Sequence, residues 1–332
     1  MNERELRTLT FDFRAARAVM AAVSLGMIER LASAPADADA IARDCGLAAR
    51  GARALLRALA ALGIVTDEAG TFALVPAARS VLVGTGERSR RSTVLHDLWH
   101  WGLWSNLEAS LRSGAPVADR KHDPFFSDPA VLAAFFPNLA RAMDETGRAA
   151  SAGLARELRL TGCERVLDLG GGAGCFAAAL ARTYPTVEIE LLDLPPVARE
   201  AERALGLAGP EGRVKVRAAD FLADPLDPTG AGFDLVLLSR VLMGLDDRAA
   251  VALIERVAAT LRPGGRVAVH EFRRTEGEAD RVGALLDLDM LLITGGAVRR
   301  PEELAAILER GGLPRVSHRR VGSLGVLVEA SR

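Results

Sequence analysis

Residues 165–174 read RVLDLGGGAG, and this stretch decides the fold of the chain. A short apolar run, typical of a buried strand, leads into a glycine-rich turn, and a helix is expected to begin directly after it. Glycines at such a turn let a ligand approach the backbone closely, and the first N–H groups of the helix can bind an anionic group. The acid Asp168 stands two residues before the first glycine, where the dinucleotide-binding fingerprint needs none.

Apolar strand-like runs alternate with helical segments from residue 165 onward. This βαβ repetition predicts an α/β fold with a mostly parallel, doubly wound, Rossmann-like sheet and helices between the strands. The last two runs, residues 314–321 and 324–330, are separated only by Gly322 and Ser323, so they can pair only as an antiparallel C-terminal hairpin. The runs are RVLDL, VEIELLD, RVKVRAA, FDLVLLS, GRVAVHEF, PRVSHRRV and LGVLVEA.

Acidic residues at the ends of neighbouring runs indicate a cofactor that contains adenosine. The second run ends in Asp193, where a carboxylate can accept hydrogen bonds from ribose hydroxyls. The third leads to Asp220 and Phe221, an acceptor for an adenine amino group beside an aromatic wall. A tight turn at residues 261–266, LRPGGR, introduces the fifth run. Together with Asp168, these features favour S-adenosylmethionine (SAM) over a nicotinamide dinucleotide.

The N-terminal part of the chain has a winged-helix pattern. Residues 18–62 read as three short helices, and residues 63–75 alternate like a hairpin. Gly26 is expected to be a close-packing point inside the first helix, and Asp37 or Asp39 to cap the second. Helix, turn, helix and hairpin in this order form the winged-helix motif.

Composition and charge restrict the partners of the chain. Arg50, Arg53 and Arg57 line the third helix and leave a DNA-binding interpretation open, but a net charge of −1 favours the solvated face of a dimerisation module. No run reaches the roughly 18 apolar residues of a membrane helix, and three scattered cysteines predict neither a disulfide framework nor a thiolate metal site. We therefore expect at least two domains, no nucleic-acid or membrane partner, and a cytoplasmic protein.

Residues 86–160 read as linking helices that contain all three tryptophans. His96 and His100 share a helical face, as metal-binding pairs do. No third ligand follows at the usual spacing, so we expect a buried aromatic helix and no metal site. His122 lies in the loop RKHDPFF and is open to either interpretation.

Six motifs now stand in register: VLDLGGGAG, ELLDLP, AADFL, FDLVLLSRVL, LRPGGRVAVHE and DLDMLLITGG. With them the chain resembles the class I SAM-dependent methyltransferases of the caffeate and acetylserotonin O-methyltransferase type, whose bacterial members act on secondary metabolites. The resemblance covers almost the whole chain. It implies a homodimer and a small-molecule substrate. It divides the chain into a winged-helix-like dimerisation domain (1–85), linking helices that contribute to the substrate pocket (86–160) and a SAM-binding catalytic domain (161–332).

The same resemblance assigns roles to individual residues. Gly170 and Gly172 face the methionine end of the cofactor, Asp193 binds the ribose, and Asp220 and Phe221 bind the adenine. The remaining cofactor-binding residues that it implies are Asp168, Leu194, Ser239 and Arg240, and the substrate-pocket residues are Met143, Met243 and Met290.

The chain departs from the family at the catalytic base. The family follows the fourth strand with L-H-D-W-D-[DE], in which the histidine takes a proton from the substrate hydroxyl, whereas this chain reads LMGLDD from residue 242. Met243 stands at the histidine position and cannot accept a proton. A phenol with a pKa of about 10 is ionised only to about 0.1% at neutral pH, and a positioned base contributes about 10²–10⁴-fold. The substitution favours sulfur, carbon or acidic oxygen as methyl acceptors.

His270 and Glu271 are the nearest candidates to replace the missing base. They are neighbours on one strand, so their side chains point to opposite faces and only one of them can line the pocket. Glu271 matches the acidic position of the family, which makes it the candidate catalytic residue, and His270 is expected to be packed in the core.

Three other functions remain open from the sequence. The fold can use SAM as a cofactor without methylation, in hydroxylation, decarboxylation or pericyclic chemistry, and Met243 is compatible with that. An NAD-dependent oxidoreductase is disfavoured by Asp168 and by the LRPGGR turn. A winged-helix regulator that senses a ligand is an alternative of another class.

Overall fold

The computed structural model describes residues 2–84, 86–117, 129–162, 164–208, 213–274 and 281–332. It divides into two compact units, Met1–Gly102 and Leu103–Arg332, which are described separately. The division falls inside the segment 86–160 that the sequence marked as linking helices. His122 and Cys163 lie outside the described residues.

The first unit consists of short helices around a small sheet of three strands in the order β1-β3-β2. Its core is formed by apolar side chains such as Met27, Ile28, Leu56 and Leu59, all fully buried. The elements are α1 (Glu3–Phe11), α2 (Phe13–Ser24), α3 (Met27–Ser33), β1 (Ala36–Asp37), α4 (Ala38–Asp44), α5 (Ala49–Ala61), β2 (Val65–Glu68), β3 (Thr71–Leu74), α6 (Pro76–Leu82) and α7 (Arg91–Trp104), which ends just past the unit boundary.

The expected helix over residues 18–32 is wrong in one respect. The chain forms two helices there, α2 and α3, and Gly26 between them has a φ of +74°. A Cβ atom at Gly26 would meet nothing within 4 Å, so this glycine ends a helix and is not a close-packing point. Asp37 is the cap of α4, because its side chain accepts a hydrogen bond of 2.7 Å from the N–H of Ala40.

The two histidines of α7 belong to an aromatic cluster. The ring centroids of His96 and His100 are 4.1 Å apart, and His96 stacks on Trp99 at 5.8 Å. In the described part of the chain, no three His, Cys, Asp or Glu side chains come close enough to hold a metal ion. Nor does any helix there have the length and apolar character that a membrane span requires.

The second unit is an α/β sandwich around seven strands in the order β6-β5-β4-β7-β8-β10-β9. Strands β4 to β8 are parallel, and β10 pairs antiparallel with both β8 and β9. The expected Rossmann-like sheet with a terminal hairpin is therefore confirmed. The elements are α8 (Leu107–Ser113), α10 (Pro129–Glu157), β4 (Arg165–Leu169), α11 (Cys175–Thr183), β5 (Glu188–Asp193), α12 (Pro195–Ala208), β6 (Val214–Ala218), β7 (Phe233–Ser239), the 3₁₀ turn η1 (Leu242–Gly244), α13 (Asp247–Ala259), β8 (Leu261–Phe272), α14 (Arg281–Ile293), α15 (Pro301–Arg310), β9 (Arg315–Val321) and β10 (Gly325–Ser331).

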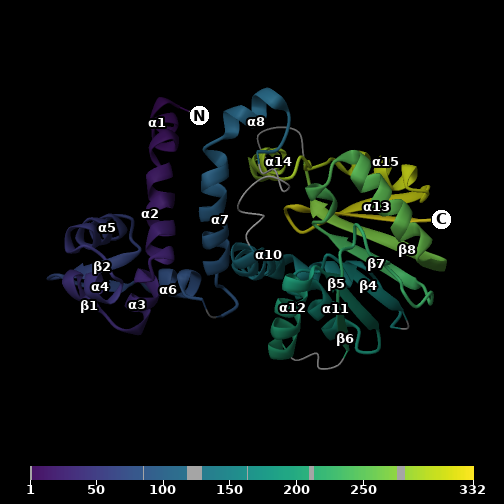
Figure 1. Cartoon of the computed structure of the whole chain (residues 1–332), viewed down its shortest axis with the longest axis horizontal. Helices are drawn as coiled ribbons and strands as arrows, with labels where there is room; N and C mark the ends of the chain where they lie inside the picture. The colour runs from purple at the N-terminus through teal and green to yellow at the C-terminus, as the bar shows by residue number, and fades with distance from the viewer. Residues whose placement is uncertain (1, 85, 118–128, 163, 209–212, 275–280) are drawn as a thin grey trace. The chain divides into compact units, whose positions relative to one another are not determined.

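Each face of this sheet has its own apolar core. Leu167 and Leu169 of β4 point to the face that packs against α13 and α15, whereas Val166 points to the face that packs against α10 and α11. Figure 1 shows α13 on one side of the sheet and α11 and α12 on the other. Burial on both faces explains why these strands read as continuous apolar runs.

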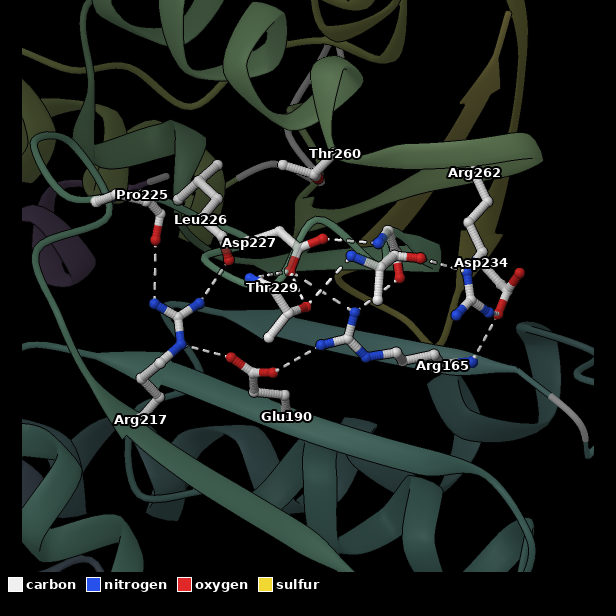
Figure 2. A network of polar contacts seen from close by, with 12 residues as sticks. Arg165, Glu190, Arg217, Pro225, Leu226, Asp227, Thr229, Asp234, Thr260 and Arg262 are labelled. Carbon is white, nitrogen blue, oxygen red and sulfur yellow. Dashed lines mark hydrogen bonds and ion pairs between the residues drawn. The ribbon is translucent and has the colours of Figure 1, made fainter.

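One connection differs from the expected βαβ repetition. Residues 219–232, between β6 and β7, contain no helix. This loop is fastened to the sheet by charged side chains (Figure 2): Arg165 donates to the carbonyl of Gly232 at 2.8 Å, and Arg217 donates to that of Pro225 at 3.1 Å. Glu190 of β5 pairs with both arginines. A polar network therefore takes the place of a packed helix here.

Asp227 gives a test of this network. Its carboxylate accepts the N–H groups of Gly232 at 2.6 Å and Thr229 at 3.1 Å. Burial raises the pKa of Asp227, but hydrogen bonds from Thr229 and Gly232 outweigh it and lower the pKa overall. A lowered carboxyl pKa stabilises the fold above the unfolded value, and this contribution is lost as the pH falls through the folded-state pKa.

We therefore expect Asp227→Ala to reduce the free energy of unfolding by about 1–3 kcal/mol at neutral pH, measured by urea denaturation. The deficit should narrow as the pH is lowered towards about 3. Glu188→Ala, at an exposed position of β5, is the control and should change little. A deficit that is the same at every pH would contradict the ionic role of Asp227.

Candidate cofactor and substrate site

The residues that the sequence singled out follow five parallel strands and meet at one edge of the sheet. Asp168 and the glycine loop belong to β4, Asp193 ends β5, Asp220 follows β6, Ser239 ends β7, and Glu271 lies near the end of β8. Because parallel strands share a direction, their carboxyl ends form one edge, which is where ligands bind in open α/β sheets.

The glycine loop after β4 has a backbone that other residues rarely adopt. Gly170, Gly172 and Gly174 have φ values of +71°, +60° and +94°. A Cβ atom at Gly170 would lie 2.8 Å from Cγ2 of Val241, whereas one at Gly172 would meet nothing within 4 Å. The loop is therefore packed at its first glycine and open at Gly172.

Asp193 fastens this loop to the neighbouring strand. Its Oδ2 accepts the N–H of Gly172 at 2.9 Å, and its Oδ1 accepts the N–H of Leu194 at 2.7 Å. Burial raises the pKa of Asp193, and the two N–H groups partly offset that effect. The hydrogen bonds of the Asp193 carboxylate therefore tie the glycine loop to the backbone of Leu194 at the end of β5.

Asp168 is a buried carboxyl on β4, beside the N–H of Ala177, which acts to lower its pKa. Its side chain is fully buried, and neither oxygen is paired within the described part of the chain. Burial and the charge of Asp193 raise the pKa of Asp168 to about 7. Ionising Asp168 in this free state is costly, and a cation beside it would make ionisation favourable.

Asp220 and Phe221 form a turn at the end of β6. Oδ1 of Asp220 accepts the N–H of Leu222 at 2.9 Å, and Arg256 of α13 donates to the carbonyl of Phe221. The half-buried ring of Phe221 lies 3.5 Å from the position that a Cβ of Gly170 would occupy. The structure therefore brings Phe221 to the glycine loop.

Arg240 connects the end of β7 to α10. Its guanidinium lies 4.3 Å from the ring centroid of Phe272 and donates to the hydroxyl of Thr146 at 2.9 Å. Its backbone has a φ of +60° and donates to the carbonyl of His270 at 2.8 Å. Thr146 had no signal in the sequence, because only the fold places α10 beside β7.

Met243 lies in η1, and side chains from two other segments hydrogen-bond to the backbone of this turn. Oε1 of Glu271 accepts the N–H groups of Leu242 at 2.9 Å and of Met243 at 3.3 Å. From the other side, Arg299 donates to the carbonyls of Leu242 at 2.8 Å and Leu245 at 2.7 Å. Burial raises the pKa of Glu271 to about 7 although both N–H groups lower it.

Arg299 is a site residue that the sequence interpretation missed. In the sequence it is one of two adjacent arginines before a helix, a pattern typical of a solvated face. In the structure it is 5% exposed. Only the tertiary fold shows that its donors meet backbone carbonyls of the turn after β7.

His270 points to the opposite face of β8 from Glu271. Its ring packs edge-on against Phe176 of α11 at 5.4 Å and is 2% exposed. Burial, together with the charge of Arg240, lowers the pKa of His270 to about 3. His270 is thus a packed core residue, as expected.

Met143 and Met290 lie on two helices, and Met143 is 37% exposed. Met143 lies on α10 and accepts, through its carbonyl, the hydroxyl of Thr146, the partner of Arg240. Met290 lies near the end of α14, and the following loop places Gly296 so close that a Cβ there would be 2.0 Å from the carbonyl oxygen of Met243.

Several buried polar atoms at this edge have no hydrogen-bond partner. Within the described residues, those buried here without a hydrogen-bond partner are Oδ1 and Oδ2 of Asp168, Oγ of Ser239, Nε of Arg240 and Oε2 of Glu271. Leaving such an atom unpaired costs about 1–3 kcal/mol, more for a charged group, and native proteins rarely do so without a functional reason. The fold and this edge are typical of an α/β enzyme whose ligand site lies at the carboxyl ends of its parallel strands.

Comparisons with known proteins identify the family. The family model of an O-methyltransferase domain matches residues 123–314, and that of an O-methyltransferase dimerisation domain matches residues 8–84. Acetylserotonin O-methyltransferase of Mus musculus is 32% identical over 335 residues, which cover 96% of this chain and 85% of the mouse protein. Mitomycin biosynthesis 6-O-methyltransferase of Streptomyces lavendulae is 31% identical over 312 residues, covering 90% and 85%.

A solved structure shows the same fold. Human N-acetylserotonin methyltransferase in complex with SAM superimposes with a TM-score of 0.85 at 23% identity, and the match covers 100% of this chain and 98% of the human one. The chain belongs to the O-methyltransferase family and is an enzyme of the methyltransferase class. The expected family, fold class and class of enzyme are confirmed.

Proposed function

We propose that this enzyme binds SAM at the carboxyl edge of its sheet and methylates a small secondary metabolite. The unpaired buried polar groups beside an open glycine loop carry the proposal. SAM offers what these groups lack: a cationic amino group, a carboxylate, a ribose diol and an adenine. When bound, it supplies a methyl group on a sulfonium sulfur.

We assign different residues to different parts of the cofactor. Asp168 and Ser239 are assigned to its methionine end, because a buried carboxylate and a hydroxyl there lack partners. Gly170 and Gly172 give its backbone access. The remaining cofactor assignments are Asp193 and Leu194 to the ribose side, Asp220 and Phe221 to the adenine, and Arg240 beside the methionine portion.

The substrate side is assigned to Met143, Met243 and Met290. Met243 is 8% exposed and sits where the family has its histidine base. An acceptor that carries no proton, or holds it weakly, suits this position: a thioether, a thiol, a carbon nucleophile or an acidic enol or phenol. Catalysis then depends on positioning and exclusion of water, which contribute several powers of ten without proton transfer.

A second function in the same fold uses SAM without consuming its methyl group. Met243 supports it, because the absence of a base leaves room for chemistry other than O-methylation. Incubation with SAM labelled in the methyl group, in the presence of candidate thiols, enols and phenols, separates the two. Transfer of label supports methylation, and substrate conversion with unchanged SAM supports the alternative.

We also propose that the enzyme is a homodimer. The chain carries the dimerisation domain of the family, and apolar side chains of α1 and α2 lie exposed. Leu6, Leu9, Phe11 and Phe13 are 52%, 51%, 63% and 48% exposed. Such a row of large apolar side chains is typical of an interface.

The cofactor proposal predicts proton release from Asp168. In the free enzyme the pKa of Asp168 is about 7, so below that pH most molecules carry the proton. The amino group of SAM lowers this pKa, so binding expels the proton and affinity rises with pH between about 5 and 7. Calorimetry at about pH 6 in two buffers of different ionisation enthalpy measures the proton count. Asp168→Asn should bind more weakly by about 1.5–3 kcal/mol and release no proton. Equal proton release by both proteins would contradict the assignment.

The acceptor proposal predicts the effect of restoring the base. Met243→His should give little or no gain in turnover, because no proton limits the reaction. At saturating SAM the rate of the unmodified enzyme should vary weakly between about pH 6 and 9, apart from ionisation of the substrate itself. A gain of about 10²-fold or more on the true substrate would show instead that a hydroxyl proton is limiting, as in ordinary phenol O-methylation.

The dimer proposal predicts a particle of about twice the 35.2 kDa chain mass in multi-angle light scattering at micromolar concentration. Replacing both Phe11 and Phe13 with serine should shift the population towards the monomer. A monomer mass for the unmodified enzyme would refute the proposal.

A further inference from the structure

The segment between β7 and α13 presents backbone groups that no sheet or helix pairs. It contains η1 and carries Met243 at the acceptor side of the proposed site. Its N–H groups at Leu242 and Met243 meet Glu271, and its carbonyls at Leu242 and Leu245 meet Arg299. A buried carboxyl group and a buried guanidinium group thus hold the turn through its backbone atoms alone.

A third contact with the turn comes from the segment that follows α14. The N–H of Ala297 donates to the carbonyl of Met243 at 3.0 Å. Gly296, beside it, leaves no space for a side chain, since its Cβ would overlap that carbonyl. The loop that carries Arg299 therefore packs directly against this turn, to which the Arg299 side chain also binds.

Arg299 is also anchored at the start of α13. Its Nε lies 2.9 Å from Oδ1 of Asp247, so three acceptors fix the orientation of one guanidinium. The planar fork of arginine satisfies such a set, and a lysine ammonium has a different geometry.

We propose that Glu271 and Arg299 are positioning residues that set the place of the Met243 turn at the acceptor side, and that Glu271 acts as an acceptor for backbone N–H groups instead of as the base. The proposal rests on the function proposed above. Oε1 of Glu271 is engaged by two N–H groups, as expected for a turn anchor, whereas Oε2 has no partner among the described residues, so the experiment has to separate the two roles. A displacement of about 1 Å at a site of this kind costs about 10²-fold in rate, so the clamp has a direct consequence for turnover.

Glutamine and alanine at position 271 separate the two roles. A glutamine carbonyl still accepts both N–H groups but cannot serve as a base at neutral pH, whereas alanine does neither. If Glu271 positions the turn, Glu271→Gln keeps kcat within about 3-fold, and Glu271→Ala lowers it by about 10²-fold. Equal losses of about 10²-fold in both variants would overturn the proposal in favour of a base.

A substitution of Arg299 provides a second test of the proposal. Arg299→Lys keeps the charge but loses the fork, and we expect kcat to fall by about 10-fold or more while the Kd for SAM stays within about 3-fold. Arg165→Lys is the control, because Arg165 of β4 is a half-buried arginine that also donates to a backbone carbonyl, that of Gly232. If this control lowers kcat as much as Arg299→Lys, general destabilisation explains the loss and the proposal fails.

Hydrogen exchange tests the clamp without SAM or substrate. Loss of the acceptor in Glu271→Ala should speed exchange of the Leu242 and Met243 amides by about 10-fold or more, and Glu271→Gln should leave it slow. Unchanged exchange in Glu271→Ala would overturn the clamp. Absence of SAM binding to the unmodified enzyme would instead refute the proposed function and leave the exchange result standing.

Discussion

The loops at the carboxyl edge of a parallel sheet have no strand to pair with, and this constraint shapes the whole site. In this chain, carboxylate side chains accept hydrogen bonds from the backbone N–H groups of these loops. Asp193 accepts the N–H groups of Gly172 and Leu194, and Glu271 accepts those of Leu242 and Met243. Each carboxylate lies on the strand next to the loop that it holds. The same kind of contact therefore orders both the glycine loop after β4 and the turn after β7.

This arrangement costs stability. Burial raises the pKa of both Asp168 and Glu271 to about 7, so ionising either carboxyl in the free protein is unfavourable. Asp168 makes no hydrogen bond among the described residues, and Glu271 uses one of its two oxygens. The apolar clusters on both faces of the sheet offset such costs, because they bury most of the strand side chains. The rigid sheet thus holds polar groups in a state that a bound cation or nucleotide would relieve.

The sequence predicted the sheet well, because the sheet follows from local patterns. Apolar runs of five to eight residues and the glycine turn at residues 165–174 are visible one after another along the chain. What depended on tertiary contacts was not predictable. Gly26 reads like any helical glycine until its φ of +74° is known, and the missing helix at residues 219–232 is replaced by arginine–carboxylate pairs that span separate strands. Arg299 was missed for the same reason, since its partners lie more than fifty residues away.

The contacts of Glu271 and Arg299 also explain how residue 243 can be a methionine without loss of the turn. Both side chains bind backbone atoms, and the third contact joins Ala297 to the carbonyl of Met243. None of these bonds involves the side chain at position 243. The path of the chain is therefore independent of whether that side chain is a base or an apolar group. A change of the side chain at position 243 therefore leaves the hydrogen bonds that hold this turn on the sheet in place.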